Sequence, residues 1–248
     1  MQPKRAAPVA VGLSREAIIA AALAEIDSGG LRNFSLRGLA RSLGVNTNVI
    51  VWHVGDRDTL MAEVLQLVLH DTLPARRSGQ DWRGWLRELF VRFRAAVRRH
   101  PNTAPLIGAD TVSNLRPDFE LVEGILAALS DAGVPEDRLC DTYNAVQAAL
   151  VGFVTQELAQ LPTEDLPSWQ AGIQANLAGV DAARYPHLVR LLPRMTNRAF
   201  ILRWQNGAAM PMDGSFGIFV DHVIAGLEAS LPRRAAPGPK MRRRPARA

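Results

Sequence analysis

Residues 35–61, SLRGLARSLGVNTNVIVWHVGDRDTLM, decide the fold of this chain. Apolar residues at helical spacing predict a short helix, a tight turn at Gly44, and a second short helix that ends near His53. Asp56 then caps a further helix that runs to about Leu73. A second helix this short buries little core by itself. This favours the interpretation that one of its faces is exposed and contacts another molecule. That layout is typical of a helix-turn-helix, whose second helix lies in the major groove of DNA.

The residues before this stretch predict one more helix and complete a three-helix head over residues 14–60. Ser14 has the side chain of an N-cap, and the helix should end at Gly29 and Gly30. Residues 1–13 are expected to form a flexible basic arm. The buried stripe of the first helix recurs at helical spacing and consists of Ile18, Ile19, Ala22, Leu23 and Ile26.

Composition places the chain among globular proteins of a reducing compartment. It has 248 residues, of which 48% are hydrophobic, enough for a sizeable core. The single cysteine, Cys140, excludes an internal disulfide framework. We find no secretory signal and no apolar run of the roughly 18–20 residues that a membrane span needs. The expectation is a cytoplasmic protein without a membrane partner.

The charge is distributed unevenly along the chain. Residues 1–57 hold 7 Lys/Arg and 4 Asp/Glu, a net of +3, and residues 58–231 hold 15 and 20, a net of −5. Residues 232–248 hold 7 basic and no acidic residues. A basic head on an acidic body indicates that one end of the molecule faces a polyanion. The basic tail, 232–248, is rich in Pro and is expected to be disordered; it either aids DNA association or extends the chain inertly.

The rest of the chain predicts an all-α fold, with a helical ligand-binding and dimerisation body over residues 61–231. Proline and glycine separate the helical patterns, and no alternating run predicts a strand. Residues 162–180 are ambiguous, and a mobile loop is one interpretation of them. Helices are expected near 81–99, 103–114, 117–131, 136–160, 181–205 and 215–231.

The head resembles that of the tetracycline-repressor (TetR) family of bacterial transcription regulators. The resemblance rests on the first-helix cap and stripe, on SLRGLARSLGV, and on NVIVWHVGDRDTLM, and it covers about residues 14–62. It continues more weakly through DWRGWLRELFVRFRAAVRRH, residues 81–100, to about Gln160. The resemblance implies a homodimeric, ligand-responsive regulator, most often a repressor that a small effector releases from a palindromic operator in double-stranded DNA.

Several residues of the head are candidate DNA contacts. Arg37, on the exposed face of the second helix, is expected to clamp a phosphate without reading sequence, although an ordinary solvated arginine is the alternative. Asn46 or Thr47 caps the recognition helix, and Thr47 and Asn48 open it. The N-terminal residues of such helices reach base edges, and asparagine can pair bidentately with adenine.

Further contacts are expected at the other end of the recognition helix. Val51 faces the groove in the family and is suited to touch a thymine methyl, with packing as the alternative. Trp52 either belongs to the core of the head or lies by the phosphate backbone with His53, as the resemblance implies. Arg57 combines its charge with a helix N-terminus to hold a phosphate. Additional minor-groove or backbone contacts are expected from Lys4, Arg5 and Arg15.

One departure from the family concerns these same positions. The family frequently has an aromatic residue where this chain has Val51, and a lysine near Gly55 or Arg57. The operator preference is therefore expected to be the chain's own.

The body offers apolar and polar candidates for an effector pocket, although the apolar ones are also typical of plain core. Ligand pockets are mostly apolar with a few placed polar groups. Where the resemblance implies an imidazole metal ligand, this chain has Ile107, so we expect a mostly apolar effector, no metal and no cofactor. Taken singly, each polar candidate is more typical of the surface. The apolar candidates are Trp85, Leu89, Phe93, Ile107 and Ile125, and the polar ones are Asp110, Asn114, Tyr143, Asn144, Gln147 and Glu157.

The last two predicted helices, 181–205 and 215–231, are the expected dimer faces. Val220, Val223, Ile224 and Leu227 form a stripe at helical spacing, which either packs across a two-fold axis or packs onto its own body. A lone head reads one half-site, so dimerisation is close to a functional requirement.

Two other classes of function compete with the regulator. An enzyme is disfavoured because the chain has no GxSxG, P-loop, GxGxxG or HExxH motif, its five histidines are scattered, and Cys140 has no obvious histidine partner. A nonspecific DNA-packaging protein is suggested by the basic tail, but the acidic body argues against it. Whether the regulator represses or activates is left open.

Overall fold

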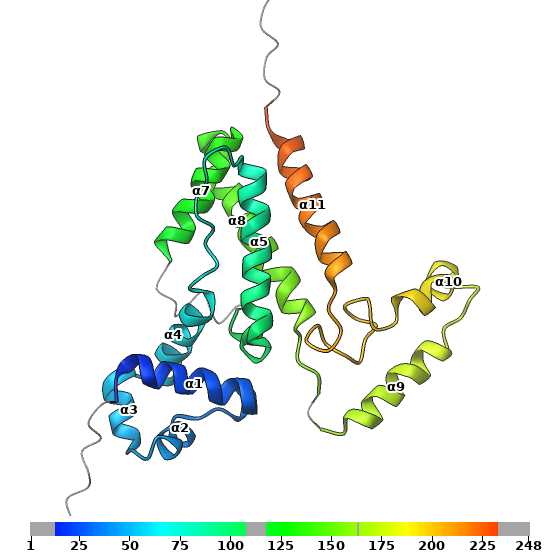
Figure 1. The fold of residues 1–248 in the computed structure, drawn as a ribbon. Helices are drawn as coiled ribbons and strands as arrows, with labels where there is room; N and C mark the ends of the chain where they lie inside the picture. Colours follow the sequence, from blue (N-terminus) through cyan, green and yellow to red (C-terminus); the bar gives the residue numbers. More distant parts are fainter. Residues whose placement is uncertain (1–12, 108–117, 163, 233–248) are drawn as a thin grey trace, which may run out of the picture.

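The computed structural model describes residues 13–107, 118–162 and 164–232, and it is all-helical over these ranges. Figure 1 shows a compact head of short helices beneath a helical body, with two further helices projecting to one side of the body. The expected basic arm up to residue 12, the basic tail from residue 233, and Asp110 and Asn114 lie outside the described residues.

The head contains the predicted helices, each started by the predicted side-chain cap. The Ser14 hydroxyl accepts a hydrogen bond from the Ala17 N–H at 3.2 Å, and Asp56 accepts one from the Thr59 N–H at 2.8 Å. Gly44 provides the turn before the recognition helix with a φ of +67°. The helices are α1 (Arg15–Gly29), α2 (Leu36–Ser42), α3 (Thr47–Val54) and α4 (Arg57–Leu69), with a short 3-10 turn, η1 (Leu31–Asn33), after α1.

Helix α4 belongs to the head and to the body at once. Its residues Leu60 and Val64 are buried in the core of the head, whereas Leu65 is buried in the core of the body. Leu69 and Leu106 pack against both cores. The domain boundary that we expect between residues 60 and 61 therefore falls inside a continuous helix.

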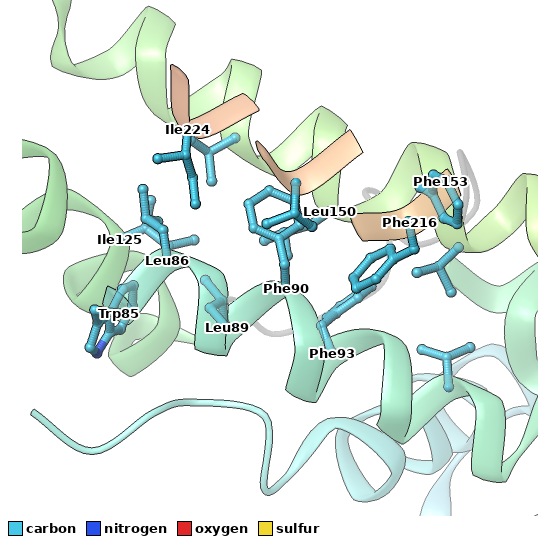
Figure 2. Packing of buried hydrophobic residues seen from close by; sticks show 14 of the residues in the cluster. Trp85, Leu86, Leu89, Phe90, Phe93, Ile125, Leu150, Phe153, Phe216 and Ile224 are labelled. Carbon is cyan, nitrogen blue, oxygen red and sulfur yellow. The ribbon is translucent and has the colours of Figure 1, made fainter. Parts of the chain in front are cut away.

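Four long helices build the body around one large apolar core, shown in Figure 2. Helix α5 contributes the widest apolar face, with Trp85, Leu86, Leu89, Phe90 and Phe93 all buried against the other helices. The remaining helices are α7 (Phe119–Ala132), α8 (Leu139–Glu157) and α11 (Asp213–Ser230), and α5 spans Trp82–Arg99. Short 3-10 segments, η2 (Pro101–Ile107) and η3 (Glu136–Arg138), connect them.

The predicted helix over 103–114 is wrong in its first part. Residues 101–107 form a 3-10 helix, and Pro105 inside it has no N–H to continue an α-helical ladder. Residues 108–114 lie outside the described part of the chain.

The structure resolves the ambiguity at 162–180 in favour of a helix, and the expected long helix at 181–205 is wrong. Residues Leu166–Ala178 form α9, because Asp165 caps it by accepting from the Ser168 N–H at 3.3 Å and Pro167 occupies the first turn, where proline is tolerated. The second segment is helical only over α10 (Pro186–Met195). Asn197, with a φ of +58°, then turns the chain away from a helix.

Candidate DNA interface and effector region

Helix α3 presents a polar and aromatic face that the head does not cover. Ile50 and Val54 point into the core of the head and are 0% and 1% exposed. On the other side, Asn48 is exposed, Val51 is 44% exposed and Trp52 is 81% exposed. Two buried residues therefore anchor the helix and leave its outer face free to meet another molecule.

Asn46 caps this helix, which settles the choice between Asn46 and Thr47. The Asn46 side-chain oxygen accepts a hydrogen bond from the Asn48 N–H at 3.0 Å. Thr47 is the first helical residue and is half-buried. The exposed Asn48 side chain follows directly, at the end of the helix that enters the groove in helix-turn-helix proteins.

The interpretation of Trp52 as a core residue of the head is wrong. Its ring lies on the surface and makes a T-shaped contact with the neighbouring His53 ring, with centroids 4.7 Å apart and planes at 81°. The core of the head is closed instead by smaller aliphatic residues such as Ile18, Ile50 and Leu60. The exposed tryptophan and the half-buried His53 thus lie together at the end of the recognition helix.

Arg37 and Arg57 are both exposed and stand on either side of α3 in the chain. Arg37 is the second residue of α2, and Arg57 is the first residue of α4, where unpaired helix N–H groups and the helix dipole add to its charge. Asp56 caps α4 beside it, and the hydrogen bonds from Thr59 hold the pKa of the Asp56 carboxyl below its usual range. A fixed aspartate next to Arg57 weakens the local positive field.

Arg15 is an expected DNA contact whose guanidinium is engaged inside the head, more closely than that of Arg57, which lies 3.9 Å from Asp58. Its Nε donates to Glu63 Oε2 at 2.8 Å, its Nη2 donates to Glu63 Oε1, and its Nη1 donates to the His53 carbonyl at 2.7 Å. The hydrogen bond to Glu63 raises the pKa of Arg15, so the side chain stays charged. These contacts join α1, α3 and α4.

In the body, the apolar effector candidates lie in the core. Trp85, Leu89 and Ile125 are at most 2% exposed, and Phe93 and Ile107 are 4% and 3% exposed. The Trp85 Nε1–H donates to the Pro74 carbonyl at 3.1 Å, which satisfies its single polar group. The plain-core interpretation therefore accounts for all five, and their contact with an effector stays a prediction.

Two polar candidates lie on one side of α8, four residues apart. The Gln147 Oε1 atom is buried and has no hydrogen-bond partner in the described structure. Tyr143 is half-buried, and burial, with a smaller contribution from the charge of Asp118, raises the pKa of its hydroxyl. A buried carbonyl oxygen without a donor costs free energy, so Gln147 is a natural place for a ligand N–H or O–H.

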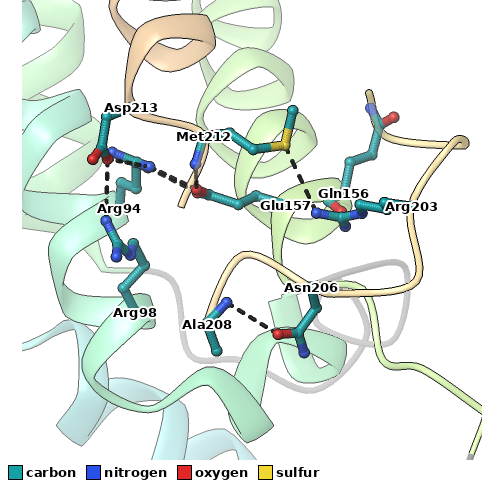
Figure 3. A network of polar contacts seen from close by, with 9 residues as sticks. All are labelled: Arg94, Arg98, Gln156, Glu157, Arg203, Asn206, Ala208, Met212 and Asp213. Atoms are coloured by element: carbon teal, nitrogen blue, oxygen red, sulfur yellow. Dashed lines mark hydrogen bonds and ion pairs between the residues drawn. The ribbon is translucent and has the colours of Figure 1, made fainter. Parts of the chain in front are cut away.

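Glu157 is not a surface residue. It is 0% exposed at the end of α8, where it accepts hydrogen bonds from Arg94 Nε at 2.7 Å and Arg94 Nη2 at 2.6 Å, as Figure 3 shows. Its Oε1 also accepts from the Met212 N–H at 2.9 Å. Arg94 further contacts Asp213 at 2.8 Å. This carboxylate is fully engaged by the protein and has little left to offer a ligand.

The sequence contains a signal for this ion pair in the position of Arg94. Arg94 follows Phe93 and lies four residues after Phe90, inside the apolar face of α5, so its position indicates a buried charge that needs a partner. Arg203, 6% exposed, is a second buried arginine of this region and donates to the Gln156 carbonyl at the end of α8. Burial lowers its pKa.

An aromatic groove of about 570 Å³ runs between α8 and α11. Phe153 meets Phe200, Phe216 and Phe219 with ring centroids 5.2 Å apart in each case. The groove is open to the surface, and Ile218 beside it is 60% exposed. The lining residues are Phe153, Phe200, Ser215, Ile218, Phe219, His222 and Val223.

The predicted dimer stripe on α11 divides between this groove and the core. Val220 and Ile224 are buried against their own body, as the alternative interpretation has it. Val223 lines the groove, and Leu227 is half-buried. The exposed apolar face of α11 therefore lies on the side of Ile218 and Val223, and not on the side of Val220 and Ile224.

Two negative findings apply to the residues that the structure describes. None of their helices is long and apolar enough to cross a membrane. In the same part of the chain, no three His, Cys, Asp or Glu side chains come together in a group able to hold a metal ion.

Comparison with known proteins identifies the family. The family model for the tetracyclin repressor-like C-terminal domain matches residues 73–231. The Escherichia coli tetracycline repressor protein class E is 27% identical over 225 residues, which cover 90% of this chain and 94% of that protein.

Solved structures share the fold. The Streptomyces coelicolor TetR family protein ActR in complex with (S)-DNPA has a TM-score of 0.67 at 19% identity, over 90% of this chain and 100% of that one. BioQ with its natural double-stranded DNA operator has a TM-score of 0.59 at 21% identity, over 88% and 99%. With a family model that matches most of its length, the chain belongs to the tetracycline-repressor (TetR) family of transcriptional regulators.

Proposed function

We propose that this chain is a homodimeric repressor that reads a palindromic operator with α3 and leaves it when a small, mostly apolar effector binds the body. The observation that carries the proposal is the uncovered outer face of α3, where Asn48, Val51 and Trp52 are exposed while Ile50 and Val54 hold the helix in place. The DNA-bound form of BioQ supports the same use of the shared fold. The chain then acts in the cytoplasm as a regulator and not as an enzyme.

The residues of the face divide between reading and positioning. Asn48 reads a base edge, for which an asparagine amide offers a paired donor and acceptor, and Val51 touches a thymine methyl. Arg37 and Arg57 hold phosphates on either side of the groove and set the register of α3, without reading sequence. His53 and Trp52 lie against the backbone at the far end of the helix.

Dimerisation through the groove between α8 and α11 places two heads on one face of the DNA. The groove is lined with aromatic and aliphatic groups, and an apolar patch of this kind is typical of an interface between subunits. Ile218→Glu should therefore give monomers in sedimentation experiments, whereas Val91→Glu, at an apolar residue 51% exposed on the outer side of α5, should leave the dimer intact. The same oligomeric state in both variants would contradict this interface.

The effector acts through its preference for one shape of the protein. It must bind the released form more tightly than the DNA-bound form, because a ligand with equal affinity for both shifts nothing. Helix α4 is the element suited to connect the two sites, since its residues are buried in the head and in the body. The ligand-bound structure of ActR supports an effector in this fold. In this chain, the buried Gln147 Oε1, which has no hydrogen-bond partner in the described residues, is the group that we assign to one polar contact with the effector.

Selection of random duplex DNA on the purified protein at near-physiological salt, followed by sequencing, tests the proposal. We expect a palindromic site, with half-sites about 34–36 Å apart. Asn48→Ala should then lose about 1–3 kcal/mol on that site and little on random DNA. Arg37→Ala should weaken binding to the site and to random DNA, and should lower the salt slope by about one. Arg138 is an exposed arginine of the body, so Arg138→Ala should change neither the binding nor the salt slope. Binding without enrichment would favour a packaging protein.

A further inference from the structure

The first residue of α1 holds the end of the recognition helix. Arg15 donates through Nη1 to the carbonyl of His53 at 2.7 Å, although the two residues are 38 positions apart in the sequence. The other donors of the same guanidinium, Nε and Nη2, bind both carboxylate oxygens of Glu63 on α4. One side chain therefore contacts α3 and α4 simultaneously from α1.

We propose that Arg15 is a positioning residue for DNA reading, which fixes the recognition helix to α4 through the His53 carbonyl and Glu63. The inference rests on the proposed use of α3 as the reading helix. It replaces the expectation that Arg15 contacts DNA directly.

The His53 carbonyl is a favourable partner for a guanidinium. The last four carbonyls of a helix have no N–H partner within the helix, and His53 lies in the last turn of α3. The Gly55 N–H bonds to Val51 and leaves the His53 oxygen to Arg15. A positive charge at a helix C-terminus is also stabilised by the helix dipole, and a charged donor makes a stronger hydrogen bond.

Glu63 fixes the guanidinium so that it cannot follow α3 alone. The paired oxygens of Glu63 match the two parallel N–H groups of Arg15, a geometry that restrains orientation as well as distance. Glu63 lies beside Val64, which is buried in the core of the head, and near Leu65, which is buried in the core of the body. A displacement of α4 therefore moves the group that holds the end of α3.

The alternative is an arginine that binds a phosphate. A phosphate contact needs donors turned outward and uncompensated charge, whereas Arg15 uses three of its five guanidinium N–H groups inside the head and its charge is balanced by Glu63. Its side chain is 43% exposed, so removal of the group leaves no cavity in the core and the variants should fold.

The experiment compares Arg15→Gln, Glu63→Gln and the exchanged pair R15E/E63R, with the enriched operator and a copy in which one half-site is scrambled. In each single variant, the ratio of the affinity for the intact operator to the affinity for the scrambled copy should fall about tenfold, and the salt slope of binding should not change. Combining the two single substitutions should add little further loss, because both break one unit. The exchanged pair keeps the net charge of the head and can restore the ion pair, but a glutamate cannot donate to the His53 carbonyl. Its melting temperature should therefore be higher than those of the single variants, while its preference for the intact operator stays as low as theirs.

Three outcomes would overturn the inference. The first is a salt slope that falls by about one in Arg15→Gln with full affinity in Glu63→Gln, as for a phosphate contact. The second is an exchanged pair that recovers operator preference together with melting temperature, which would make the ion pair merely structural. The third is Arg15→Gln with normal preference. Asn48→Ala, measured in parallel, separates this failure from that of the proposed function, because a normal operator preference in Asn48→Ala would contradict the proposed reading of a base edge by α3.

Discussion

Replacement of Glu157 by alanine tests the buried ion pair of the body. The carboxylate is 0% exposed and accepts hydrogen bonds at 2.7 and 2.6 Å from Arg94 and at 2.9 Å from the Met212 N–H. After its removal, the Arg94 guanidinium keeps Asp213 at 2.8 Å, but the Asp213 side chain is 70% exposed and its charge is screened by water. The variant thus leaves a buried charge with one weak partner.

The size of the effect follows from these contacts. Removal of one member of a buried pair costs about 3–5 kcal/mol, and the remaining Asp213 puts this site at the lower end, about 3 kcal/mol. The Met212 N–H without an acceptor adds about 1 kcal/mol. Since 1 kcal/mol corresponds to roughly 2–4 °C in a chain of this length, Glu157→Ala should melt about 8–16 °C lower.

Two further variants make the reasoning refutable. Glu157→Gln keeps an oxygen for the Met212 N–H, so its loss in the free energy of unfolding should be about half that of Glu157→Ala. The double variant R94M/E157L replaces the pair by apolar groups of similar volume and should lie within about 2 kcal/mol of the unmodified protein. Urea unfolding at a fixed protein concentration measures all three. A loss below 1 kcal/mol in Glu157→Ala, or a double variant less stable than that single variant, would refute the argument.

Three other predictions concern packing and pH. Gly207→Ala places a Cβ atom 2.8 Å from the Glu157 carbonyl oxygen and should destabilise by about 1–3 kcal/mol in urea unfolding; an unchanged midpoint would contradict the packing. The pKa of the Asp81 cap is held below its usual range, chiefly by the Gly84 N–H at 2.9 Å, so its stabilisation is present above the unfolded pKa and is lost as pH falls through the folded one. Melting scans from about pH 6 to pH 2 should therefore show a smaller acid loss in Asp81→Asn. Phe153→Leu removes three ring contacts at 5.2 Å and should destabilise by about 1–3 kcal/mol in urea unfolding, so an unchanged stability would count against the aromatic cluster.

The head could be predicted from the sequence because its signals are local. Ser14, Ser35 and Asp56 each cap a helix by a hydrogen bond to an N–H three residues later, so a window of a few residues contains both partners. The turn at Gly44 needs a positive φ, which glycine readily adopts. The family followed from this region and the all-α fold from the helical patterns of the rest of the chain; both predictions are confirmed.

The body could be predicted only in part, because its decisive contacts are distant in sequence. Arg94 and Glu157 are 63 residues apart, and nothing local to Glu157 indicates burial. Pro167 hid α9, because it lies in the first turn of that helix, where a missing N–H costs nothing, whereas the expected helix over 181–205 ignored Pro186, at which α10 begins. The face of α3 that meets solvent was predictable, but the exposure of Trp52 was not, because an aromatic side chain fits a core or a surface site equally well by periodicity.

The double membership of α4 limits how the modules of this regulator can be exchanged. Because Leu69 and Leu106 pack against the cores of both head and body, no cut in the chain separates two independently packed units. A chimera that takes its head from another regulator must therefore keep the side chains of the head that pack against Leu69 and Leu106. An engineered sensor that joins this body to a foreign head at the end of α3 would place Leu60 and Val64 against a foreign core, so its head would pack poorly and lose DNA affinity together with its response to the effector.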